Sequence, residues 1–144
     1  MAIGGTTSTP VFVKDGQYLS LTADNAITLG NVVQFTTTGT DTCDVGAANT
    51  TCIGVAVAGN RFSRTSTDDT IAAGNKVTVC TRGVVYVYTG TSAILKGSFL
   101  EMGASGIVEL AGTAGTATDP RDVIGIALDA NGSAATTIRM QLRL

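Results

Sequence analysis

About one third of this chain consists of β-branched residues, and this abundance restricts its fold more than any other feature. Val, Ile and Thr supply 47 of the 144 residues, whereas the better helix formers Leu, Met, Lys, Arg, Glu and Gln supply only 26. β-Branched side chains lose rotamer freedom in a helix but pack well on a pleated sheet. We therefore predict an all-β chain without a helix longer than two turns.

Short segments that alternate between apolar and polar residues predict where the strands lie. In the clearest, 136–144, Ile138, Met140 and Leu142 share one face and the residues between them share the other. The predicted strands are 11–14, 17–21, 32–36, 52–58, 76–81, 83–88, 99–102, 107–110, 123–128 and 136–144. Strands this short and closely spaced predict a small β-barrel or sandwich of short antiparallel strands.

One strong and one weak signal for a hairpin occur in the first third of the chain. The dipeptide Asp15-Gly16 lies between the predicted strands 11–14 and 17–21. A type I′ turn needs positive φ at both central positions, which Asp and Gly tolerate, so a tight hairpin is predicted there. The Thr-rich segment 36–51 is expected to form either a loop or an irregular edge hairpin.

Two apolar patterns that contain glycine recur along the chain. The first, Ile-x-x-Gly-x-x-apolar, occurs at Ile27/Gly30/Val33, Ile71/Gly74/Val77 and Ile94/Gly97/Leu100. In the second, Ile-Gly-Val-Ala-Val at 53–57 recurs as Ile-Gly-Ile-Ala-Leu at 124–128. A glycine inside a strand indicates a bulge, a bend or the close approach of another backbone. Repeated corner-turning glycines favour a small closed barrel.

The composition changes near residue 10, which divides the chain into a flexible N-terminal arm at 1–10 and a single β domain at 11–144. The arm is uncharged, its sizeable apolar groups are Met1 and Ile3, and Pro10 marks the junction. Ten extended residues reach up to about 33 Å. We therefore expect the arm to cross to a neighbouring subunit and add an edge strand there, the alternative being a frayed terminus without a role.

Missing residue types exclude several functions. The chain has no His, which removes Ser-His-Asp and Cys-His catalysis and most zinc sites. Its net charge of −2 gives no basic excess for nucleic acid. No apolar run approaches the roughly 20 residues that span a bilayer. We predict a protein that is not an enzyme, with no catalytic, cofactor-binding or metal-binding residues, no cofactor, and neither nucleic acid nor a membrane as partner.

The three cysteines, Cys43, Cys52 and Cys80, are an odd number without a Cys-x-x-Cys motif. This usage fits synthesis in a reducing compartment better than a disulfide-stabilised secreted fold. Cys43 and Cys52 could close a small loop if oxidised, which the sequence leaves open. Cys80 is expected to face the core or a neighbouring chain.

The sparse charges indicate that surfaces, rather than a catalytic centre, carry the function. Charged residues make up 14% of the chain, whereas about 25% is usual. Part of the surface is therefore expected to be buried against copies of the chain or a larger assembly.

Arg139 and Arg143 share one strand face and could either contact an acidic partner or blunt a sheet edge. The densest charge cluster, also a candidate interface, comprises Arg61, Arg64, Asp68 and Asp69.

The segment 123–142, Val-Ile-Gly-Ile-Ala-Leu-Asp-Ala-Asn-Gly-Ser-Ala-Ala-Thr-Thr-Ile-Arg-Met-Gln-Leu, resembles the C-terminal segment of small capsid cement (decoration) proteins of tailed bacteriophages. That family commonly ends in a segment of the type IGVALE…A…G…TTVRV. The resemblance covers about 100 residues and extends upstream through 27–35, 52–57, 71–87 and 94–101, of which 71–87 resembles a hairpin of the family.

The resemblance implies a β-barrel-like domain that forms homotrimers on the outer surface of the capsid, at three-fold or quasi-three-fold positions. Its partners would be the major capsid protein and other copies of itself, and it would be made in the host cytoplasm. It would bridge neighbouring capsid subunits after the shell expands, and so oppose the pressure of packaged DNA. Residues 1–14 and 59–70 depart from the family pattern, and virus-specific contacts are expected there.

A second hypothesis is a tail-associated or receptor-binding β module that recognises a host surface glycan. Such a site would offer exposed aromatic rings, and Tyr86 and Tyr88 are the one pair at suitable spacing. Two-residue spacing on a strand is more typical of core or interface packing.

Overall fold

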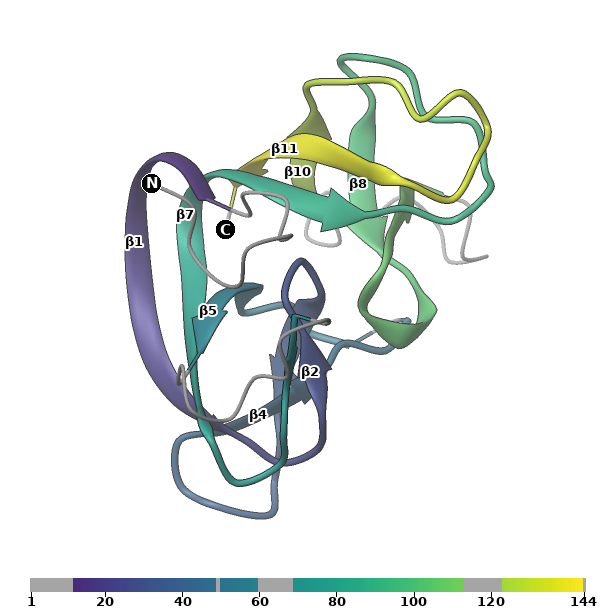
Figure 1. The fold of residues 1–144 in the computed structure, drawn as a ribbon. Helices are drawn as coiled ribbons and strands as arrows, with labels where there is room; N and C mark the ends of the chain where they lie inside the picture. The colour runs from purple at the N-terminus through teal and green to yellow at the C-terminus, as the bar shows by residue number, and fades with distance from the viewer. Residues whose placement is uncertain (1–11, 49, 60–68, 113–122, 144) are drawn as a thin grey trace.

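The computed structural model describes residues 12–48, 50–59, 69–112 and 123–143 (Figure 1). Regular structure in these ranges is strand, apart from the 3-10 turn η2 (Ala104–Gly106), so the predicted all-β class is confirmed. Within the same ranges, no helix has the length and apolar character needed to span a membrane. The strands are β1 (Phe12–Ala23), β2 (Ile27–Thr28), β3 (Val32–Phe35), β4 (Thr42–Val45), β5 (Gly54–Gly59), β6 (Thr70–Ile71), β7 (Lys76–Tyr88), β8 (Phe99–Met102), β9 (Val108–Leu110), β10 (Val123–Ala127) and β11 (Thr137–Arg143).

The long strand β7 organises the fold. β1 pairs antiparallel with one edge of β7, while β5 and β11 pair with the first and second halves of its other edge. The order β1-β4-β3-β5-β7 returns to β1 and closes a barrel. Beyond the barrel the same nine-stranded sheet continues as β7-β11-β10-β8-β9, a part called the second sheet below, and an isolated bridge joins Thr89 to Val108 across it. β2 and β6 pair separately. Figure 1 shows β7 bending as it passes from the barrel to the second sheet.

Glycine produces the bend in β7. Burial alternates along the two predicted strands 76–81 and 83–88, but these segments form one continuous strand. Gly83 lies between them with φ +130°, a conformation that a side chain would strain. The prediction of two strands is therefore wrong, and 71–87 does not form the hairpin that its resemblance to the family implies, since 76–88 is one strand and β6 pairs with β2. The glycine redirects the strand instead of ending it, so that one strand serves both the barrel and the second sheet.

The hairpin predicted at Asp15-Gly16 is also wrong, because β1 runs through this dipeptide without turning back. Lys14 pairs with Val84 and Gln17 with Arg82, so three steps along β1 match two along β7. A bulge absorbs the extra residue, and pairing with the long edge of β7 outweighs the local turn preference. The segment 36–51 contributes one strand, β4, which forms a hairpin with β3 just before the segment. β4 also pairs with β1, so it is not the edge strand that the sequence offered as an alternative to a loop.

The recurring glycine patterns have the structural roles that the sequence predicts. Gly30, Gly74 and Gly97 of the first pattern all have positive φ, between +83° and +95°. Each lies in the turn that precedes a strand, which confirms the prediction of corner-turning glycines.

In the second pattern the glycine lets two backbones approach closely. A Cβ atom on Gly54 of β5 would lie 2.2 Å from the carbonyl oxygen of Cys80 on β7. A Cβ atom on Gly125 of β10 would lie 2.6 Å from the carbonyl oxygen of Gln141 on β11. Both strands can therefore lie against their neighbours only because this position has no side chain.

The core extends from the barrel into the second sheet. Along β11 the burial alternates as predicted, with Ile138, Met140 and Leu142 facing inward. The largest fully buried side chains include Ile27, Leu29, Ile71, Ile94 and Leu100. A continuous core couples the positions of the barrel and the second sheet, because neither can shift without opening apolar contacts.

All three cysteines are buried free thiols, so Cys43 and Cys52 are not joined and Cys80 faces the core. Burial raises the pKa of the Cys43 thiol to about 11 and that of Cys52 to about 12. It also raises the pKa of Cys80, whose thiol donates to the carbonyl oxygen of Arg82 at 3.1 Å. Neutral thiols are poor nucleophiles, so these residues act as small apolar core groups.

Candidate interaction surfaces

Most of the interface residues predicted from the sequence lie outside the described residues, and their roles stay predictions. These are Met1, Ile3, Pro10, Arg61, Arg64 and Asp68. Of the predicted charge cluster, Asp69 is described. It is half-buried just before β6, and its backbone carbonyl accepts a hydrogen bond of 2.9 Å from the backbone amide of Leu29.

Arg139 and Arg143 share the outer face of β11, as predicted, but they differ in their partners. Arg139 donates through Nε and Nη2 to the two carboxylate oxygens of Asp129, at 2.9 and 2.7 Å. Its backbone amide donates to the same carboxylate at 3.0 Å. The side-chain hydrogen bond from Arg139 lowers the pKa of Asp129 to about 2, so the pair is fully ionised at neutral pH. Arg139 is thus neutralised within the protein.

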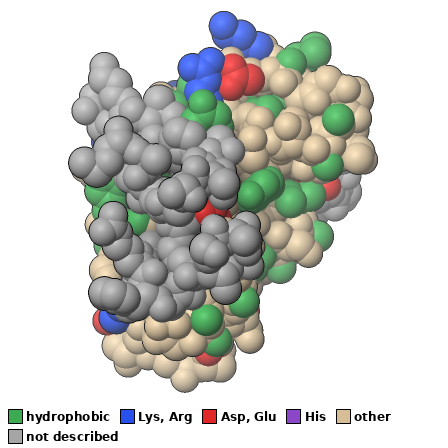
Figure 2. All heavy atoms as spheres, viewed as in Figure 1, with side chains coloured by type: hydrophobic (Ala, Val, Ile, Leu, Met, Phe, Trp, Pro, Cys, Tyr) green, Lys and Arg blue, Asp and Glu red, His purple; other side chains and the backbone are tan. Residues whose placement is uncertain are grey.

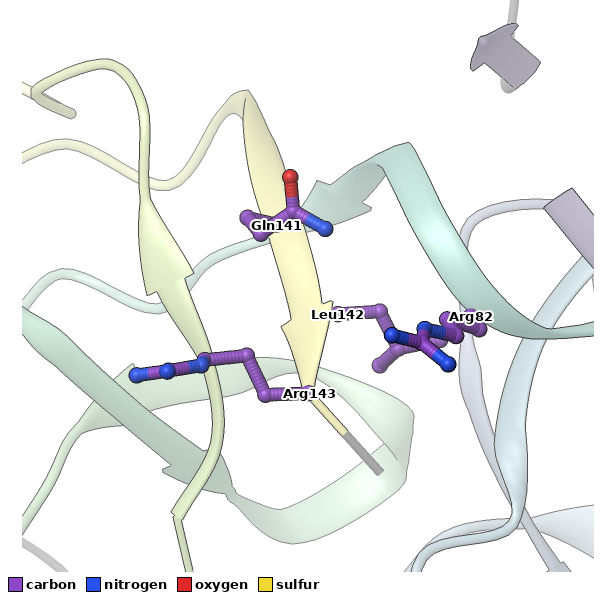
Figure 3. Close-up of a pocket in the computed structure, with 4 residues that line it drawn as sticks. All are labelled: Arg82, Gln141, Leu142 and Arg143. Atoms are coloured by element: carbon purple, nitrogen blue, oxygen red, sulfur yellow. The ribbon is translucent and has the colours of Figure 1, made fainter. Parts of the chain in front are cut away.

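Arg143 lies beside a second arginine that the sequence reasoning missed. In the antiparallel register of β11 and β7, Arg143 is directly opposite Arg82, and both side chains are exposed. Together with Gln141 and Leu142 they line an open pocket of about 500 Å³ (Figure 3). The sequence prediction left Arg82 between the strands 76–81 and 83–88, whereas the continuous strand β7 includes it in the sheet.

The outer face of the second sheet has a row, called the apolar row below, of three apolar residues and one glutamine, which the sequence patterns did not indicate. Phe99, Ile126, Gln141 and Val84 are successive cross-strand partners on β8, β10, β11 and β7. The side chain of Phe99 is 53% exposed, and nearby in sequence Leu95 is 70% exposed. The inward orientation of Leu100 could have indicated that Phe99 points outward. Hydrophobic side chains are scattered among polar ones over the described part of the face in Figure 2.

The two tyrosines proposed as a glycan platform are half-buried packing residues. Tyr86 packs against the hydrophobic core. The ring of Tyr88 lies over the turn at Gly30, where an added Cβ would be 3.1 Å from it. This arrangement gives no support to a stacking platform for a sugar.

The described residues contain no group of three or more His, Cys, Asp or Glu side chains that could hold a metal ion.

Comparison with known proteins agrees with the sequence resemblance. The structural cement protein family (E217 gp24/Pam3 gp6) matches residues 2–143. Among solved structures, the head fiber gp8.5 N base of bacteriophage phi29 matches with a TM-score of 0.61 and 18% identity, over 88% of this chain and 93% of that one. This second likeness shows a shared fold. No curated protein is significantly similar in sequence. The family match spans nearly the whole chain, and the chain therefore belongs to the structural cement proteins of bacteriophages, a family of virion structural components.

Proposed function

We propose that the protein binds the outer surface of the phage head as a homotrimer and reinforces the contacts between neighbouring major capsid subunits against the pressure of packaged DNA. The observation that carries this proposal is the match to the structural cement family over residues 2–143. The role is mechanical and needs no catalytic group.

The surface of the chain suits such a role. Few charges need to be desolvated on binding, because charged residues make up 14% of the chain. Exposed apolar side chains on separate elements, such as Phe35 on β3 and Phe99 on β8, can be buried against partners. A ligand that spans two shell subunits must detach before they separate, so its binding free energy adds to the stability of the joint.

The test uses expanded, DNA-filled shells that lack this protein. Adding the purified protein at saturating concentration is expected to raise the temperature at which these shells release their DNA by several degrees. Heat-disruption curves followed with a DNA-binding dye measure this effect, and an unrelated small β protein at the same concentration is the control. Sedimentation of the free protein at micromolar concentrations tests for the trimer. Shells that bind the protein without any gain in heat resistance would contradict the proposed reinforcement.

A further inference from the structure

Arg82 and Arg143 form a pair of exposed cations that no carboxylate compensates within the part of the chain that the structure describes. They are direct cross-strand partners in the pairing of β11 with β7, so two positive charges are carried by adjacent positions of the sheet. Neither guanidinium has an acidic partner among the described residues. Such a partner would be expected, because the chain has 11 acidic residues for nine basic ones and a net charge of −2. Four residues before Arg143 on the same face, Arg139 has a bidentate carboxylate partner. Judged from the described residues, Arg82 and Arg143 can bind a ligand from outside, whereas Arg139 is already paired.

The surroundings of the two arginines indicate the chemistry of that ligand. Figure 3 shows Arg82 extending toward Leu142, while Arg143 extends away on the other side of β11. Two separated guanidiniums suit two carboxylates on one segment better than a single small anion. Gln141, which lines the same pocket, adds an amide that can donate or accept a hydrogen bond.

The neighbouring surface favours a protein partner over nucleic acid. The apolar row that includes Phe99, Ile126 and Val84 crosses the sheet beside the two arginines, two residues away from them on β11 and β7. An apolar centre flanked by arginines is typical of protein interfaces. Two arginines on a chain of net negative charge are too few for binding to a phosphate backbone.

We propose that Arg82 and Arg143 bind an acidic segment of the shell subunit, with carboxylates on both sides of the end of β11, while the adjacent apolar row is buried in the same contact. This inference rests on the proposed function, since it names the part of the protein that meets the shell. It assigns the arginines to the shell rather than to contacts between copies of this chain.

The test compares the native protein and two variants for binding to expanded shells. Arg82→Gln with Arg143→Gln removes both free cations, and the affinity is expected to fall about tenfold or more. The matched control, Arg139→Gln, removes a cation that is already paired within the protein and should change the affinity less than twofold. Raising the salt concentration should weaken binding of the native protein, and it should weaken binding of the double variant much less. Urea unfolding should show that the double variant is at least as stable as the native protein.

Three other outcomes would each contradict the assignment of the arginines, and they differ in what they imply for the proposed function. If the native protein does not bind shells at all, the proposed function fails, and this assignment fails with it. If the native protein binds and the double variant binds equally well, the assignment to Arg82 and Arg143 is wrong while the proposed function stands. If the double variant loses self-association in sedimentation but keeps its affinity for shells, the arginines join copies of the chain, which also overturns the assignment.

Discussion

Replacing Gly54 with alanine is expected to lower the free energy of unfolding by about 3 kcal/mol, because the added methyl group meets the backbone of a neighbouring strand. The new Cβ would lie 2.2 Å from the carbonyl oxygen of Cys80 and 2.6 Å from a methyl carbon of Val79. A backbone carbonyl within a sheet cannot rotate away as the end of a side chain can, so β5 must move away from β7. Since β5 closes the barrel, the whole fold should be affected.

The matched control for this variant is Gly74→Ala. Gly74 also has positive φ, at +83°, but no atom lies within 4 Å of its ideal Cβ position. This substitution should therefore cost only the backbone strain, about 1 kcal/mol. Urea unfolding of both variants measures the difference. If Gly54→Ala and Gly74→Ala lower the free energy of unfolding equally, the close approach of β5 to β7 is not the reason why Gly54 is needed.

Asn131→Ala is the second substitution with a large expected effect, again about 3 kcal/mol, because one buried amide satisfies several backbone groups. Its Nδ2 donates to the carbonyl oxygens of Gly90 and Ser92 at 3.2 and 2.8 Å. Its Oδ1 accepts from the backbone amides of Ile94 and Ser133 at 2.9 and 3.0 Å. Because only 5% of the surface of Asn131 is exposed, water cannot easily replace the hydrogen bonds that the substitution removes.

Asn75→Ala provides the comparison for this substitution. Asn75 also donates from Nδ2 to a backbone carbonyl, that of Ala72 at 3.3 Å, but the contact is exposed. Water can take its place, so the loss should be about 0.5 kcal/mol or less. Thermal unfolding of the two variants gives both values. A drop in melting temperature no larger for Asn131→Ala than for Asn75→Ala would contradict the role assigned to the buried amide.

Local patterns predicted much of the fold because their causes are local. The alternation of Ile138, Met140 and Leu142 depends on the two-residue period of a strand, and these side chains face the core. The turn glycines, such as Gly30, could be predicted because positive φ strongly favours glycine. The order of the low-complexity motifs, rather than any single residue, indicated the cement family that the comparison confirms.

Features that depend on pairing between distant strands could not be predicted in the same way. Asp15-Gly16 has a strong local preference for a turn, but the long edge of β7 holds β1 in one continuous strand. For the same reason Arg82 was not recognised as a neighbour of Arg143, because their proximity follows from the register of β7 against β11. The candidate site, Arg82 with Arg143, therefore depends on how distant strands pair. The ion pair between Arg139 and Asp129 shows only that Arg139, on the same face of β11, is not part of that site.

Electron cryomicroscopy of expanded shells with and without the added protein tests the central claim most directly. The difference map is expected to show extra density on the outer surface, at three-fold or quasi-three-fold positions, with room for three copies of this fold in contact with more than one shell subunit. Density confined to the tail or to the inner surface, or no extra density at saturating protein, would contradict a role as an external cement.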